Sequence, residues 1–258
     1  MSGLARGRQP QHAGWPPNVV VRIFSRVTQL SEATDPLFVA FGAICGITFF
    51  GAFGALYLYA GLRGPGMRTL FDLDGERTLP AAFSGGLLAA ASVLASTLAE
   101  YGGDAGVPRR FVTTFGFVLA FMALDEVLSL HERLELWTGI DWQILYMPVA
   151  AVAAVTWAGT LSWLWRLRSG GTPLLLGGAV LWLASQVFEF VQWGGFRSDA
   201  SAQRWAILPE ELGEMLGSVL FGLALLVALR QALRLRGTVR PAYHRAAGSR
   251  SPRDAAGG

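Results

Sequence analysis

The sequence contains no lysine, one cysteine and three histidines, and charged residues make up only 15% of its 258 positions. The single Cys45 cannot form an intrachain disulfide, which excludes a disulfide-stapled fold. Because His12 and His244 lie in polar terminal segments, His131 is the one histidine in the apolar part of the chain, and this disfavours histidine-rich membrane desaturases and hydrolases. Phosphate-loop, dinucleotide-binding, Gly-x-Ser-x-Gly and Cys-x-x-Cys motifs are also absent.

Apolar residues are what the chain has in excess. They make up 52% of it, and the mean hydropathy is +0.41, which is more apolar surface than one soluble core of this size would use. Six runs reach the roughly 20 residues that a membrane span needs. They lie near Pro36 to Leu62, Pro80 to Tyr101, Phe111 to Leu130, Ile144 to Leu167, Pro173 to Trp193 and Leu208 to Leu235. The sequence therefore predicts an all-α, polytopic transmembrane helix bundle of about six spans.

All basic residues are arginine, and their distribution predicts a topology. Fifteen of the 21 arginines lie in the two terminal segments and the loops on the same side, and six lie on the opposite side. Cytoplasmic segments of membrane proteins carry the excess of positive charge. We therefore expect a multi-pass protein of the plasma (cytoplasmic) membrane with both termini in the cytoplasm, as six spans require.

The predicted organisation has three parts: a cytoplasmic arm over residues 1–35, the membrane domain over 36–235, and a disordered basic cytoplasmic tail over 236–258. Within the arm, apolar residues at helical spacing predict an amphipathic helix over 18–30 that lies on the leaflet, with an ordinary lead-in helix as the alternative. The first apolar run is too long for a signal-peptide core, so we expect no cleaved signal. The dispersed arginines predict no nucleic-acid partner.

Acidic residues interrupt three of the apolar runs. Asp125, Glu189 and Glu214 each lie about a turn or more inside a predicted span. An ionised carboxylate in hydrocarbon costs at least a few kcal/mol unless it is paired, protonated, hydrated or bound to a metal. In the predicted topology all three lie in the outer half of the bilayer, where Asp141 joins them at the start of the fourth span. This placement predicts one polar site in that half of the membrane.

Helical spacing predicts which side chains share a face. Offsets of four and seven residues place Asp125, Ser129 and Glu132 on one stripe of a continuous helix, with Glu126 and His131 on either side of it. In the sixth span, Glu210 and Glu214 form an i, i+4 pair, and Glu211 lies on the same broad face. Three helices could thus present oxygen-rich faces to one interior space.

The roles expected for these residues follow from their chemistry. Carboxylates with one imidazole suit a divalent iron, manganese, zinc or calcium ion, and the predicted metal ligands are Asp125, His131, Glu132, Glu189 and Glu214. The four carboxylates in this set are also the predicted catalytic acid–base groups, and His131 could instead shuttle protons. We expect supporting or access roles for Glu126, Asp141, Glu210 and Glu211. Two simpler interpretations stay open: a solvated helix end for Glu132, and a helix start for Glu210 and Glu211 after Pro209.

These residues favour a metal-dependent membrane hydrolase or oxidoreductase that acts on a lipid-like substrate from within the bilayer. A proton- or cation-coupled transporter is the main alternative, because it would use the same carboxylates to bind and release an ion. A noncatalytic membrane scaffold or assembly factor is the third. The expected partners are the lipid bilayer and a lipid-like small molecule, and the sequence predicts no particular oligomeric state.

Overall fold

The computed structural model describes residues 22, 25–30, 34–60, 70–73, 75, 77–194 and 200–248. These residues form helices and no strands, which confirms the predicted all-α class. The helices are α2 (Pro36–Ala60), α4 (Leu79–Tyr101), the 3-10 helix η1 (Gly103–Ala105), α5 (Arg109–Leu128), α6 (Leu130–Thr138), α7 (Trp142–Arg166), α8 (Gly171–Gly194) and α9 (Ala200–Gly248).

Six of these helices are long and apolar enough to cross a membrane, as the hydropathy predicted. The six candidate spans are Pro36–Leu56, Leu79–Tyr101, Arg109–Leu128, Trp142–Arg166, Gly171–Phe190 and Ala206–Arg236. They are 20 to 31 residues long, and 20 residues already match the thickness of a bilayer core. The side of the membrane on which the termini lie stays a prediction from the arginine count.

The two terminal segments were harder to predict. Helix α9 continues to Gly248, although the sequence predicted a disordered tail from residue 236. Extending an established helix adds one backbone hydrogen bond for each residue that is fixed, so composition is a weak guide to where a long helix ends. In the arm, Arg22 and residues 25–30 are helical, and the other residues of the predicted amphipathic helix over 18–30 lie outside the described part of the chain.

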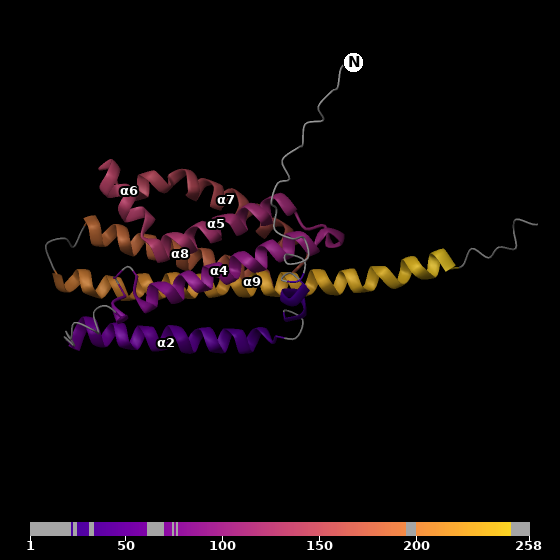
Figure 1. Cartoon of the computed structure of the whole chain (residues 1–258), viewed down its shortest axis with the longest axis horizontal. Helices are drawn as coiled ribbons and strands as arrows, with labels where there is room; N and C mark the ends of the chain where they lie inside the picture. Colours follow the sequence, from indigo (N-terminus) through magenta and orange to yellow (C-terminus); the bar gives the residue numbers. More distant parts are fainter. Residues whose placement is uncertain are drawn as a thin grey trace, which may run out of the picture.

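Helix α9 is the central element of the bundle (Figure 1). Helices α2, α4 and α8 pack against it, α5 packs on α4, and α7 packs on α5. Side chains on α4, α5 and α9 form most of the main apolar core, which includes the fully buried Leu88, Leu98, Leu225 and Leu229. Because lipid tails are as apolar as leucine, close van der Waals packing rather than exclusion from water holds such helices together.

Glycines bring α8 and α9 into close contact. A Cβ atom added to Gly217 would lie 2.5 Å from Cδ1 of Trp182 and 3.0 Å from the carbonyl oxygen of Gly178. A Cβ atom added to Gly178 would lie 2.7 Å from the ring of Phe221. Small residues at such contacts let two backbones approach closely in a membrane. This contact sets the distance between α8 and α9.

The chain direction gathers four helix ends at one end of the bundle. Helices α5 and α8 finish where α7 and α9 begin, and the short α6 lies at this same end (Figure 1). We call this the α6 end, and the end that carries the α7–α8 loop the α7–α8 loop end. The intramembrane acidic residues of α5, α8 and α9 therefore lie toward the α6 end.

The close glycine contact predicts a large effect of Gly217→Val. We expect the added side chain to force α8 and α9 apart and to lower the free energy of unfolding by about 1–3 kcal/mol. Gly86→Ala is the matched control, because a Cβ atom at Gly86 meets nothing within 4 Å and alanine favours a helix by up to about 1 kcal/mol over glycine. Thermal unfolding of the detergent-purified variants measures both effects. An unchanged midpoint for Gly217→Val would contradict the close contact.

Candidate functional site

A break between α5 and α6 creates the first part of the site. Helix α5 ends at Leu128, and Ser129 takes the left-handed conformation with φ 53° and ψ 50°. Few residues other than glycine, asparagine and aspartate adopt this conformation. The backbone N–H of Ser129 donates to the carbonyl oxygen of Asp125 at 2.7 Å, and α6 starts at Leu130. The chain therefore folds back on the last turn of α5.

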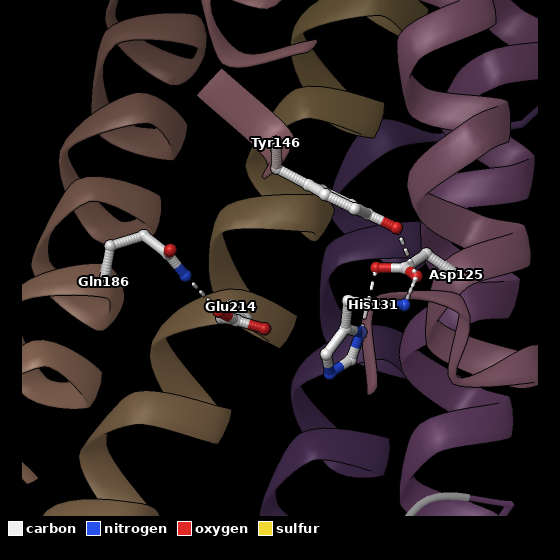
Figure 2. Close-up of polar contacts among 5 residues, drawn as sticks. All are labelled: Asp125, His131, Tyr146, Gln186 and Glu214. Carbon is white, nitrogen blue, oxygen red and sulfur yellow. Dashed lines mark hydrogen bonds and ion pairs between the residues drawn. The ribbon is translucent and has the colours of Figure 1, made fainter. Parts of the chain in front are cut away.

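This turn brings His131 onto the carboxylate of Asp125 (Figure 2). The backbone N–H of His131 donates to Asp125 Oδ1 at 2.9 Å, and His131 Nδ1 lies 3.1 Å from Oδ2. From α7, the Tyr146 hydroxyl donates to Oδ1 at 2.8 Å. Because an ionised carboxylate only accepts hydrogen bonds, Nδ1 carries the hydrogen when Asp125 is ionised. Asp125 thus fixes the orientation of the imidazole.

The predicted stripe of Asp125, Ser129 and Glu132 was wrong. It assumed one continuous helix, but the left-handed conformation of Ser129 ends α5 and changes the helical phase. His131, which was expected at the side of the stripe, is the residue that meets Asp125. Glu132 lies in the first turn of α6 with an exposed side chain. The structure therefore does not bring Glu132 to Asp125.

Aromatic rings from α5 and α7 surround this pair. The ring of Trp142 is centred 5.1 Å from that of His131 and 5.6 Å from that of Tyr146. Phe121 also packs on Tyr146, with 5.4 Å between the ring centroids. Tyr146 and Trp142 were not among the residues predicted for the site. Their i, i+4 spacing beside Asp141 was the signal that could have identified them.

Glu189 lies on α8. Its carboxyl group is partly buried, and it interacts electrostatically with His131 and Asp141. The participation of Glu189 in the polar site stays a prediction.

Glu214 on α9 lies among neutral hydrogen-bond donors from α8 (Figure 2). Ser185 Oγ is 3.2 Å and Gln186 Nε2 is 3.1 Å from its Oε1 atom. The charges that act most strongly on Glu214 are those of other carboxyl groups, Glu126, Glu210 and Glu189. Carboxylates that are close together repel one another when ionised, so a proton or a cation among them lowers the free energy. The arrangement is suited to take up either.

The remaining predicted residues have distinct positions. Asp141 is exposed and caps α7, because its Oδ1 accepts the backbone N–H of Gln143 at 2.8 Å. Glu126 is partly buried on α5. Glu210 and Glu211 are also partly buried, but α9 begins at Ala200, so the simpler interpretation of these two residues as a helix start was wrong. They lie well inside the helix, away from its positive end.

The metal site stays a prediction. Among the described residues, no three histidine, cysteine or acidic side chains are placed to hold one ion. Both carboxylate oxygens of Asp125 already contact Tyr146 or His131. A carboxylate on one imidazole nitrogen commonly supports a histidine that binds metal through the other nitrogen. Of the predicted ligands, His131 fits that role best, and Asp125 fits as its support.

Comparison with known proteins provides a family. Residues 35–229 match the family described as "Domain of unknown function (DUF8692)". No curated protein and no solved structure matches the chain. The match covers the whole bundle from the start of α2 into α9.

The three contacts of Asp125 predict that Asp125→Asn destabilises the protein by about 1–3 kcal/mol. The amide NH₂ group of asparagine is a donor, and it would replace a carboxylate oxygen that accepts hydrogen bonds from His131 or Tyr146. Glu132→Gln is the control, since Glu132 is exposed on α6, and it should change stability by less than about 0.5 kcal/mol. Thermal unfolding of the purified variants in detergent compares them. Equal midpoints for the two variants would contradict the assignment of His131 and Tyr146 as partners of Asp125.

Proposed function

We propose that this chain, which belongs to the DUF8692 family, is a multi-pass membrane enzyme in which Asp125 and His131 transfer protons during a reaction on a lipid-like substrate. The observation that carries the proposal is the 3.1 Å contact between His131 Nδ1 and Asp125 Oδ2, held in place by a backbone hydrogen bond to the same carboxylate. A histidine fixed in this way is prepared for general acid–base chemistry rather than for structural support alone.

The proton path proposed here begins at His131. Asp125 holds Nδ1, so Nε2 takes the proton from a substrate or a water molecule and later returns it, while the carboxylate stabilises the charged imidazolium. Tyr146 donates to the same carboxylate and restrains its orientation. Glu189 interacts electrostatically with both His131 and Glu214, so it is the group through which a second proton would be exchanged between the two parts of the site.

The apolar surroundings of the site favour a lipid-like substrate. Asp125, Tyr146, Glu189 and Glu214 all belong to candidate membrane spans. At the same end of the bundle, Leu124, Ile144 and Val187 are 56%, 64% and 62% exposed, as expected of side chains that face lipid. A substrate that reaches the site from the bilayer must itself be largely apolar. The rings of Phe121, Trp142 and Tyr146 provide a wall against which such a molecule can pack.

The packing of the core between the two ends of the bundle gives less support to a transporter. Toward the α7–α8 loop end, apolar side chains such as Leu98, Phe115 and Leu229 are packed without exposure or nearly so. The buried hydroxyl of Thr97 bonds to the carbonyl of its own helix, at Val93. Glu100, the acidic residue at the end of α4, pairs with Arg109 at 3.0 Å. A polar site confined to one end of the bundle suits catalysis better than passage of an ion.

A metal-dependent form of this enzyme is the second candidate, and the carboxylate on His131 Nδ1 is the observation that favours it. The described side chains do not form a three-ligand set as they are placed, so no step of the proposed chemistry depends on a metal. Iron, manganese, zinc and calcium remain the ions proposed from the ligand types.

The proton-transfer proposal is tested with purified protein in nanodiscs made from a total membrane lipid extract. We expect the wild type to convert at least one lipid over time, and His131→Gln and Asp125→Asn to slow this conversion by about 10²–10⁴-fold. Glu132→Gln is the matched control and should keep the wild-type rate. Lipid composition is followed by liquid chromatography and mass spectrometry.

Two results would overturn the enzyme proposal. Equal rates for His131→Gln and the wild type would show that the pair takes no part in the chemistry. A wild type that converts no lipid but carries protons or cations into proteoliposomes would establish the transporter instead. A wild type inactive in both assays would favour the scaffold.

Metal analysis of the same detergent-purified protein separates the two forms of the enzyme. The metal-dependent form predicts a stoichiometric divalent metal in the wild type and its loss in folded His131→Gln and Asp125→Ala variants, since His131 best fits a ligand and Asp125 supports it. Thermal unfolding confirms that each variant is folded. Lipid conversion by metal-free wild type would eliminate this form and leave acid–base catalysis by the protein alone.

A further inference from the structure

A pocket lies at the α7–α8 loop end, away from the acidic site. It has a volume of about 610 Å³ and is lined by Trp165, Arg166, Arg168, Ser169, Thr172 and Pro173. These residues come from the last turn of α7, the loop and the first turn of α8. Because they lie at the ends of two candidate membrane spans, the pocket is at the depth of the lipid headgroups.

The charge of this pocket is positive. Arg166 and Arg168 both line it, and the sequence contains no acidic residue between Asp141 and Glu189. Neither arginine forms a salt bridge with a residue that the structure describes. Arg166 donates through Nε to the carbonyl of Ser162 at 3.2 Å, which anchors the guanidinium group. Its terminal nitrogens carry the donors that match a planar or tetrahedral oxyanion.

A buried hydroxyl in the same pocket points to a ligand independently of this charge. Thr172 is only 7% exposed, and its Oγ1 atom has no hydrogen-bond partner within the described part of the chain. Buried hydroxyl groups are rarely left unsatisfied, because they lose their bonds to water without replacement. An oxyanion bound between the arginines would supply the missing acceptor.

The loop that carries these residues is held in one conformation. Arg168 is left-handed with φ 49°, and its N–H bonds to the carbonyl of Trp165 at 3.0 Å. The N–H of Ser169 bonds to the carbonyl of Leu164 at 3.1 Å, and the Ser169 hydroxyl accepts the N–H of Gly171 at 3.2 Å. Gly171 packs so tightly on α9 that an added Cβ atom would lie 2.8 Å from the carbonyl oxygen of Ala224. The geometry of the pocket therefore exists before a ligand binds.

We propose that this pocket binds the phosphate group of a membrane phospholipid, with Arg166, Arg168 and the Thr172 hydroxyl as donors. The positive end of the α8 dipole starts at Gly171 and favours the same negative charge. Trp165 is 67% exposed at this rim, a position in which tryptophan anchors to the interface between headgroups and acyl chains. The site is separate from the proposed enzyme chemistry and does not depend on it.

The test measures how much lipid the full-length protein retains, by native mass spectrometry after purification from micelles that contain phosphatidylglycerol. We expect Arg166→Gln combined with Arg168→Gln to weaken retention at least about tenfold, because two charge-assisted contacts are lost. The control combines Arg109→Gln with Arg110→Gln, which removes two arginines at the same end of the bundle but outside the pocket. A neutral glycolipid with the same acyl chains should bind all variants equally.

Substitutions of Thr172 separate the hydroxyl from the charge. Thr172→Val should weaken retention of phosphatidylglycerol severalfold, and Thr172→Ser, which keeps the hydroxyl, should restore it. Inorganic phosphate added to lipid-free protein distinguishes the two sources of this anion: binding that requires both arginines, without a preference for phospholipid, identifies free phosphate as the ligand. Equal retention by the double pocket variant and its control, with no binding of inorganic phosphate, would overturn the proposal.

Discussion

The constraint on which the described structure depends is that a polar group in hydrocarbon must find its partners within the protein. Asp125 meets this constraint with three donors, two from His131 and one from Tyr146. Each donor requires a particular piece of architecture, namely the turn at Ser129 and the start of α7 beside α5. The break between α5 and α6 and the contacts of this carboxylate therefore occur together.

The same constraint favours a one-sided site. Backbone groups of the six long helices bond within each helix, and apolar side chains fill the bundle toward the α7–α8 loop end. The acidic residues are left at the α6 end, where neutral donors such as Ser185 and Gln186 can reach them from α8. Rigid placement of a histidine on a carboxylate suits proton transfer at a fixed point.

The two ends of the bundle have opposite chemistry. Carboxyl groups of α5, α8 and α9 gather toward the α6 end, whereas Arg166 and Arg168 line a pocket at the α7–α8 loop end. The arginine count predicts that this second end faces the cytoplasm, whose leaflet carries the anionic lipids. A fixed phosphate contact at the α7–α8 loop end would orient the protein in the membrane. The proton-transfer site at the α6 end would carry out the chemistry.

Hydropathy alone determined the all-α class and the six spans, because each span is a local run of apolar residues and every one of its backbone bonds is made within the helix. It also identified Asp125, Glu189 and Glu214, because the free-energy cost of a carboxyl group in lipid depends on that residue and on its neighbours in the sequence. Only the tertiary structure decided that His131, and not Glu132, meets Asp125, and that Tyr146 joins them. One left-handed residue, Ser129, changes the directions of the side chains that follow it in α6 relative to those of α5. The contact between α5 and α7 depends on tertiary packing, which no local sequence pattern encodes.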